Sequence, residues 1–279
     1  MAASSNYPPQ IRAFSLVELS IVLVIIGLLV GGILAGRSLI RASELRAVTT
    51  EHDRYKTAIM AFRDKYFALP GDMINATSFW GTDAGGCPGN NASSTSPSSQ
   101  TCNGNGDGMI NVNTSISHES YRAWQHLAGA GLIEGSYTGV SNSVAISSFT
   151  SSLTTPNSPA SKLAGGFWIV QYSNTATITD TARFDGAYGH VLSVSNISSP
   201  TNGQGALLKP EEAWNIDTKS DDGKPGLGKI TSRKNAAQAN STTGCSNIDY
   251  TTVASIAASS DYLLNNSQIV CSLLFKIGL

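Results

Sequence analysis

The sequence predicts an α+β fold, with a long N-terminal α-helix packed on a globular head that contains an antiparallel β-sheet. An apolar stretch of 23 residues lies near the N-terminus, a helical pattern continues directly from it, and short alternating runs fill the later part of the chain. Only 13% of the residues are charged, and 18 basic side chains balance 19 acidic ones. Since no basic patch appears, nothing indicates nucleic acid as a partner.

The apolar stretch covers residues 14–36, and its one charge is that of Glu18. At about 1.5 Å per residue, a helix of this length matches the hydrocarbon core of a bilayer. A lone carboxylate in such a segment is costly, which makes Glu18 a candidate functional residue. Residues 1–13 are short and polar, and we expect them to be a leader rather than a domain.

The sequence around the start of the stretch, RAFSLVEL at residues 12–19, resembles the processing site of type IV pilins and of type II secretion pseudopilins. The resemblance implies that a prepilin peptidase cuts between Ala13 and Phe14 and methylates the new amino group. Glu18 then becomes the fifth residue of the mature chain. Two departures stand out: Ala13 replaces the usual glycine, and the apolar helix lacks the proline that many pilins carry.

The resemblance also implies a type IV pilin-like fold and a function in assembly. The apolar half-helix would wait in the bacterial inner membrane with a cytoplasmic N-terminus. An ATPase-driven assembly platform would then lift it into a periplasmic or extracellular filament, a polymer of this chain or of several pilins. In the filament core, Glu18 would pair with the Phe14 amine of a neighbouring subunit, so that two buried charges offset each other. Basic residues flank the span on both sides, so this orientation rests on the resemblance and not on charge.

Two alternatives remain open from the residues alone. A secretory signal normally has a shorter apolar region, of about 7–15 residues, and Glu18 interrupts this one. A membrane-anchored binding or enzymatic domain that does not polymerise would keep an uncut N-terminus and would be indifferent to Glu18. No compact catalytic motif appears in the sequence, so we predict no catalytic residue and no enzyme activity.

The helix is expected to continue past the apolar stretch. Apolar and aromatic residues recur at intervals of three and four, which is the pattern of one buried helix face: Leu45, Val48, His52, Tyr55, Ile59, Phe62 and Tyr66. Pro70 then ends the helix, because proline has no N–H and clashes with the preceding turn. The predicted organisation is therefore a leader at 1–13, a membrane and filament-core half-helix at 14–36, an amphipathic half-helix at 37–68 and a head at 69–279.

The four cysteines are consistent with an oxidising compartment. As nearest neighbours in sequence, Cys87 is paired with Cys102 and Cys245 with Cys271. Four cysteines allow three connectivities, so the sequence does not decide among them. No pair has the spacing of a zinc site.

A polar loop after Cys102 resembles the first half of a calcium loop, because oxygen-bearing residues alternate before a turn glycine: Asn103, Asn105 and Asp107. The position that would complete the loop is Thr114, so Glu119 would have to supply the missing carboxylate. The alternative is a tight polar turn without a metal. Calcium is therefore a candidate cofactor, and no other cofactor is predicted.

A second acidic loop contains Asp217, Asp221 and Asp222. Oxygen ligands of this kind also suit a hard cation. Lys219 lies among them and would neutralise part of their charge, which favours a loop that balances itself.

The rest of the head is predicted to contain two more helices and several strands. Ser117 is the expected N-cap of a helix at 117–132, and residues 210–214 would open a short helix that begins at Pro210. Alternating runs bounded by turn residues predict antiparallel strands at 144–146, 167–172, 176–179, 190–194 and within 268–279.

Overall fold

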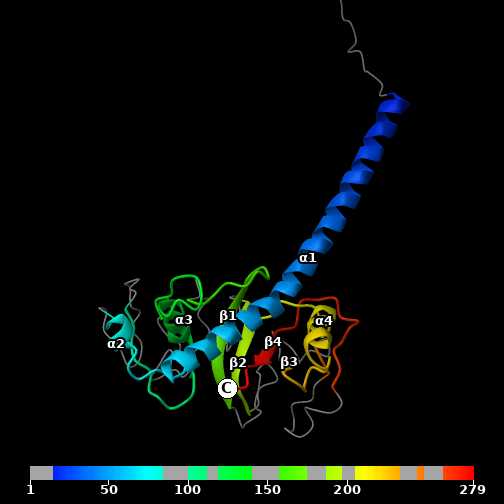
Figure 1. Ribbon diagram of the computed structural model, residues 1–279. Coiled ribbons are helices and arrows are strands. Elements are labelled where there is room, and N and C mark those ends of the chain that lie inside the picture. Colours follow the sequence, from blue (N-terminus) through cyan, green and yellow to red (C-terminus); the bar gives the residue numbers. More distant parts are fainter. Residues whose placement is uncertain are drawn as a thin grey trace, which may run out of the picture. The chain divides into compact units, whose positions relative to one another are not determined.

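The computed structural model describes residues 15–83, 100–111, 119–139, 157–174, 187–196, 205–232, 244–247 and 260–279. Figure 1 shows the helices, which are α1 (Leu16–Tyr66), α2 (Thr77–Trp80), α3 (Glu119–Gly129) and α4 (Pro210–Ser220). The strands are β1 (Gly166–Asn174), β2 (Ala187–Asn196), β3 (Ile230–Ser232) and β4 (Leu273–Lys276). The chain divides into two compact units, Met1–Ser43 and Glu44–Leu279. The fold is α+β, with a long apolar N-terminal helix followed by a globular part.

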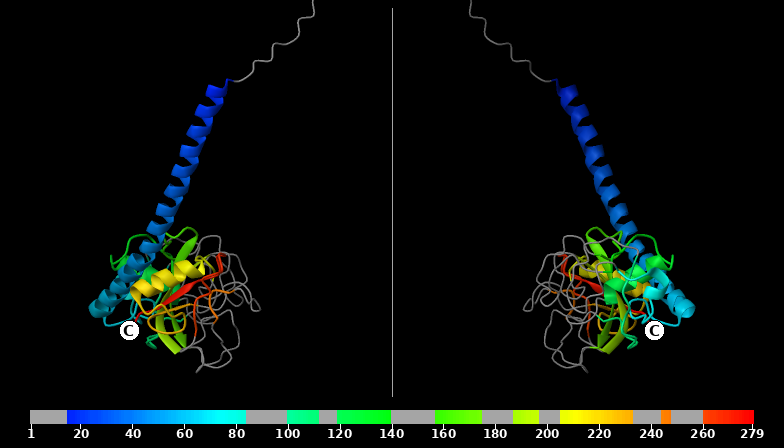
Figure 2. Two further views of the ribbon diagram at one scale, coloured as in Figure 1. Left: turned by 90° about the vertical axis from the view of Figure 1, so that its right-hand side faces the viewer. Right: turned by 90° about the vertical axis from the view of Figure 1, so that its left-hand side faces the viewer.

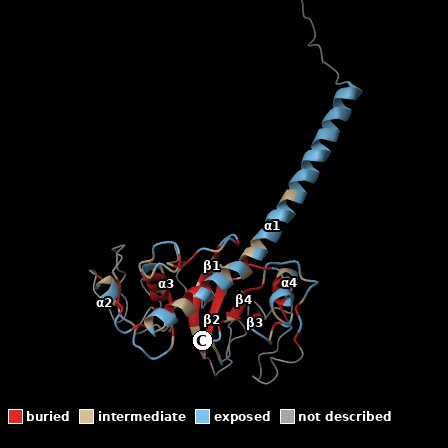
Figure 3. Cartoon of the chain, in the orientation of Figure 1, coloured by how far each residue is buried: buried red, intermediate tan, exposed pale blue. Residues whose placement is uncertain are grey.

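In the first unit, helix α1 is apolar around its whole circumference, and none of the described residues buries that surface. Sixteen large apolar side chains between Leu16 and Ile40 are exposed, and Figure 3 shows this part of the helix in the colour of exposed residues. A helix that is hydrophobic on all sides needs an apolar environment around it. This part of α1 therefore requires an apolar partner, which the described part of the chain does not provide.

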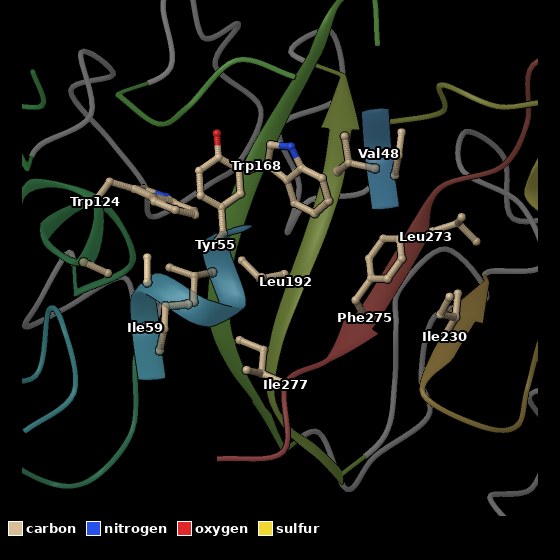
Figure 4. Close-up of a cluster of buried hydrophobic side chains, with 14 of the residues drawn as sticks. Val48, Tyr55, Ile59, Trp124, Trp168, Leu192, Ile230, Leu273, Phe275 and Ile277 are labelled. Carbon is tan, nitrogen blue, oxygen red and sulfur yellow. The ribbon is translucent and has the colours of Figure 1, made fainter. Parts of the chain in front are cut away.

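In the second unit, α1 buries one face against the sheet (Figures 2 and 4). The ring of Tyr55 lies edge-on to Trp124 at 5.1 Å and to Trp168 at 5.7 Å. The imidazole of His52 stacks on Phe275 at 4.7 Å. Tyr55 and His52 both belong to the predicted apolar stripe. The periodicity of the sequence therefore identified the buried face of this part of the helix.

The four strands form one antiparallel sheet in the order β1-β2-β4-β3. Since side chains alternate between the two faces of a strand, the register decides which residues meet α1. Leu192 of β2 lies opposite Val170 of β1 and Phe275 of β4, and Phe275 lies opposite Ile230 of β3. All four are buried, so this row crosses the sheet on the core side (Figure 4). On the other face, Val191 and Leu274 form a separate small cluster.

Helix α1 ends earlier than predicted and for a different reason. The last helical residue is Tyr66, and Phe67 adopts a left-handed conformation with φ 54°. A residue of this conformation at the C-terminal end stops a helix, usually as glycine, and here it costs roughly 1 kcal/mol. The predicted stop at Pro70 is therefore wrong, because the chain has already left the helix before the proline.

Several other predicted elements appear with different bounds. Helix α4 begins at Pro210, as predicted, and extends to Ser220, with Ala213 and Ile216 on its buried face. Helix α3 ends at Gly129, before the predicted residue 132. Strand β3 was not predicted, because three residues are too few to show an alternating pattern. The predicted strands at 144–146 and 176–179, and the predicted N-cap Ser117, lie outside the described residues.

Glu51 ties α1 to the sheet, although its place in the helical pattern predicts a solvent-facing residue. Its carboxylate accepts hydrogen bonds from the Ser161 hydroxyl at 2.6 Å, the Lys162 backbone N–H at 2.8 Å and the Trp168 indole N–H at 2.8 Å. Trp168 is fully buried. The carboxylate therefore satisfies a buried donor of β1 and fixes the approach of the segment that leads into this strand.

Replacing Glu51 by alanine is expected to destabilise the second unit. The change leaves three donors without their acceptor, and hydrogen bonds to a charged group contribute about 1.5–3 kcal/mol each. We expect a net loss of about 2–4 kcal/mol, or a fall in Tm of roughly 5–15 °C for a domain of this size. Thermal unfolding of the detergent-solubilised chain measures it. The control is Asp64→Ala on the same helix, where the side chain is 77% exposed; equal Tm values for the two variants would contradict the role of Glu51.

Candidate functional site

The first turn of α1 places Glu18 close to the start of its own helix. Ser15 is the N-cap residue, because its carbonyl accepts the first intrahelical bond, from Leu19 N at 3.1 Å. The Ser15 backbone N–H donates to Glu18 Oε2 at 2.9 Å, and Val17 N–H donates to Ser15 Oγ at 3.3 Å. The Ser15 hydroxyl and the Glu18 carboxylate thus each accept from a backbone N–H group that has no intrahelical acceptor.

The surroundings of Glu18 are apolar. Between residues 16 and 36, Glu18 is the one charged side chain, and sixteen large apolar side chains between Leu16 and Ile40 are exposed. Keeping that surface in water costs on the order of tens of kcal/mol, since a fully exposed side chain of this kind costs about 1.5–3 kcal/mol. By length and composition, α1 is the one helix among the described residues that could cross a membrane. Ala13 and Phe14, the predicted processing residues, lie outside the described residues.

The loop of the predicted calcium site folds around Asp72. The Asp72 Oδ1 atom accepts from the backbone N–H groups of Gly106 at 2.6 Å and Asp107 at 3.1 Å, and Oδ2 accepts from Gly108 N–H at 2.9 Å. Burial raises the pKa of Asp72, and the bonds from Gly108 and Gly106 act in the opposite direction. Gly106 and Gly108 both have positive φ, which lets consecutive N–H groups point to one carboxylate.

Three carboxylates gather at this loop. Asp72, Asp107 and Glu119 each offer an oxygen within 4.8 Å of the others. Glu119 accepts from Asn111 N–H at 2.8 Å, and Asp107 accepts from the Asn105 side-chain amide at 3.0 Å. The structure thus brings together two of the predicted acidic ligands and adds Asp72.

The other two predicted ligands of the loop are used differently. The Asn103 side-chain oxygen accepts from Thr77 N–H at 2.9 Å, at the start of α2. The Asn105 side-chain oxygen accepts from Asp107 N–H at 3.0 Å within the loop. Asp72 was missed because it lies 35 residues before Asp107 in the chain, and no local pattern joins the two.

In the second acidic loop, the predicted carboxylates also lie close together and accept hydrogen bonds from the protein. Asp217, Asp221 and Asp222 offer oxygens within 4.8 Å of one another. Asp217 is fully buried and accepts from the Tyr262 hydroxyl at 2.7 Å. Burial raises the pKa of Asp217 to about 6, and the hydrogen bond from Tyr262 lowers it in part. Asp221 accepts from Ile230 N–H at 2.9 Å, and so it leads the chain into β3.

His126 is a structural residue rather than a ligand. It is fully buried, its Nδ1 accepts from Gly71 N–H at 2.9 Å, and its Nε2 lies 3.0 Å from the Thr101 hydroxyl. Burial lowers the pKa of His126 to about 3. The neutral imidazole therefore joins α3 to the turn after α1 and to the segment around Thr101.

A disulfide joins Cys245 to Cys271, with Cα atoms 5.0 Å apart. This is the pairing that nearest neighbours in sequence predict. It ties the segment 244–247 to the residues just before β4. Cys102 is also disulfide-bonded, and Cys87, its predicted partner, lies outside the described residues.

Comparison with known proteins identifies the N-terminal segment. The family model of the prokaryotic N-terminal methylation motif matches residues 9–34, which include Ala13, Phe14 and Glu18. This motif is the signature of type IV pilins and pseudopilins. It supports a type IV pilin-like or pseudopilin protein. No curated protein and no solved structure matches the chain.

The calcium prediction can be tested on the detergent-solubilised chain. Extracellular calcium sites bind with Kd of about 0.1–1 mM, so about 10 mM calcium should raise Tm by a few degrees. Asp107→Asn should remove most of that shift, since it takes a charge from the cluster that also holds Asp72 and Glu119. Asp64→Asn, on an exposed part of α1, should keep the shift. No heat on calorimetric titration, or an undiminished shift in Asp107→Asn, would contradict a site at this loop.

Asp217 should make stability depend on pH in one direction. Its pKa rises on folding from the ordinary 3.8 to about 6, so between these values the folded chain binds more protons than the unfolded chain. Stability from this group is then full below about pH 4 and is lost as the pH rises towards 6. In thermal unfolding, the Tm of the wild type relative to Asp217→Asn should fall by roughly 5 °C across this window. A constant difference would show that Asp217 does not titrate there.

Proposed function

We propose that this chain is a structural subunit of a type IV pilus or a type II secretion pseudopilus. Prepilin peptidase cuts before Phe14, and the subunit assembles through its N-terminal helix. One observation carries this proposal. The part of α1 that matches the methylation motif exposes a continuous apolar surface, and Glu18 is its one carboxylate.

The apolar surface supports two successive environments for the helix. A bilayer can hold the stretch before assembly, since its length suits the hydrocarbon core. The helix can leave the bilayer only when another apolar environment receives it, and a core of packed helices from other subunits is such an environment. A transfer from lipid to helix bundle avoids the large cost of placing this surface in water. Assembly at the inner membrane by a platform and an ATPase is what the resemblance to type IV pilins and pseudopilins implies, and the apolar surface is compatible with it.

Glu18 supplies the specificity that apolar contact lacks. Cleavage before Phe14 creates an amine at the start of the mature chain, and in a parallel bundle the amine of one subunit lies near Glu18 of the next. Two opposite charges in an apolar core offset each other, whereas removal of one partner typically costs about 3–5 kcal/mol. The pair therefore selects one axial register among many apolar contacts of similar energy.

The N-terminus of the mature protein tests processing. Mass spectrometry of the purified chain should find a methylated amine on Phe14 and no residues 1–13. A subunit that keeps residues 1–13 and never polymerises would instead be a membrane-anchored domain, and the proposal would fail.

The role of Glu18 is tested by Glu18→Ala. The variant should be membrane-bound and folded, with filament yield reduced by at least about 100-fold, as expected for the loss of about 3 kcal/mol or more per added subunit. Sheared filaments and membrane-bound subunit are quantified by immunoblotting. Ser20→Ala, which changes a neighbouring polar side chain of the same segment, should assemble as the wild type. Normal filament yield from Glu18→Ala would refute the pairing.

A further inference from the structure

A cavity of about 290 Å³ lies beside α1 in the second unit, and we propose that it binds a phosphate group, as inorganic phosphate or as a small phosphate ester. Helix α1 contributes one wall, and the segment after α4 contributes the other together with β3 and β4. The lining residues are Thr49, His52, Asp53, Lys56, Ser220, Lys229, Ile230, Phe275 and Lys276. All of them belong to the second unit, so the site is separate from the segment to which we assign assembly.

The wall on α1 follows from the helical spacing of its residues. His52, Asp53 and Lys56 come three, four and seven positions after Thr49, and this spacing puts the four side chains on one face of a helix. His52 also belongs to the apolar stripe that packs on the sheet. The polar face therefore borders the buried face of α1, and the cavity lies where α1 meets the sheet.

Asp221 holds the opposite wall in position. Its carboxylate accepts hydrogen bonds from the backbone N–H groups of Lys229 and Ile230. Ile230 lies opposite Phe275 in the sheet, and both side chains are buried, so they close the cavity on the side of the core (Figure 4). The backbone of Lys229 is thereby fixed, and Lys229 is exposed where it lines the cavity.

Two lysines of the cavity are available to a ligand. Among the described residues, Lys56 and Lys229 have no ion pair and no side-chain hydrogen bond. The ammonium group of Lys276, in contrast, donates to the Gly228 carbonyl oxygen at 2.7 Å and lies 5.0 Å from the centre of the Tyr188 ring. An ammonium group has three donors and binds phosphate as a point charge. Lys56 and Lys229 are therefore the expected phosphate contacts.

The carboxylates near the cavity already accept hydrogen bonds from the chain. Asp53 Oδ1 lies 3.0 Å from His52 Nδ1, Asp221 accepts from the two backbone groups named above, and Asp222 accepts from Lys224 N–H at 2.8 Å. The three carboxylates balance the three lysines at long range, where salt also screens the charges. An anion therefore gains its binding energy from direct contact inside the cavity.

His52 presents a buried acceptor at the wall. Burial lowers the pKa of His52, and the hydrogen bond to Asp53 raises it in part, so the imidazole is neutral at pH 7. Since an ionised carboxylate only accepts, Nδ1 carries the proton and donates to Asp53 Oδ1. Nε2 is then an acceptor, and it is buried with no hydrogen-bond partner among the described residues. A buried acceptor of this kind beside a cavity fits a ligand that brings a donor.

This acceptor distinguishes phosphate from other anions of similar shape. Inorganic phosphate carries at least one hydroxyl group at neutral pH, and the alcohol part of a phosphate ester can carry one, whereas sulfate has none. The Ser220 hydroxyl offers a further donor to the phosphate oxygens. Ligand pockets usually measure about 300–1,000 Å³, so a cavity at the lower end of this range suits a phosphate group with a small substituent.

The first measurement is isothermal titration of the detergent-solubilised full-length chain with phosphate, glycerol 3-phosphate or sulfate at neutral pH. Sodium chloride at about 0.15 M screens non-specific attraction. We expect saturable binding of phosphate or its ester, about tenfold or more tighter than that of sulfate. The tighter of the two ligands tells whether the cavity takes the free ion or an ester. No saturable binding of either, or equal affinity for sulfate, would overturn the proposal.

Three variants assign the binding to the cavity. Lys56→Gln and Lys229→Gln each remove an ammonium group and should weaken phosphate binding about 10–100-fold. His52→Phe keeps an aromatic ring in the stack and removes the acceptor, so it should bind phosphate no better than sulfate. The control is Lys65→Gln, which lies outside the cavity on the same helix and should bind phosphate as the wild type does.

The lysine variants also separate a lost contact from a lost fold or a changed net charge. Lys229 is exposed, so Lys229→Gln should unfold at the Tm of the wild type, and thermal unfolding checks this. Wild-type affinity in both Lys56→Gln and Lys229→Gln would overturn the site. Equal weakening in Lys65→Gln would show that net charge causes the loss, and it would overturn the site as well.

Discussion

The structure depends on one constraint: the first part of α1 cannot remain in water. Its apolar side chains point outward on every side, and nothing in the described chain covers them. Under the proposed function, lipid covers that surface first and other helices cover it afterwards. Since apolar contact alone does not distinguish one register from another, the single carboxylate at Glu18 acquires its importance from the same constraint.

The two parts of helix α1 differ in how far their side chains are buried. Its first part is exposed and apolar, whereas its second part forms the core of the head through Tyr55, Phe62 and their neighbours. The bond of Glu51 to Trp168 adds a polar anchor within that core. A single helix, Leu16–Tyr66, thus contains both the segment to which we assign assembly and a part of the core of the head.

The acidic residues of the head hold their loops in place by accepting hydrogen bonds from backbone N–H groups. Asp72 collects three backbone N–H groups of a glycine-containing loop, and Asp221 directs the chain into β3. In such a loop the carboxylate accepts hydrogen bonds from backbone N–H groups that have no backbone acceptor within the loop. A cation at either cluster would add to this arrangement, since the loops are already held by backbone donors.

By itself, the sequence determined the features that repeat along the chain or stand out from it. The apolar stretch, its lone Glu18 and the helical stripe through Tyr55 are of this kind. Only the tertiary structure decided that Asp72 organises a loop 35 residues away, that Glu51 faces Trp168 and that three residues form β3. The physical reason is that periodicity records which face of an element is apolar, whereas a polar contact between distant segments leaves no pattern in either one.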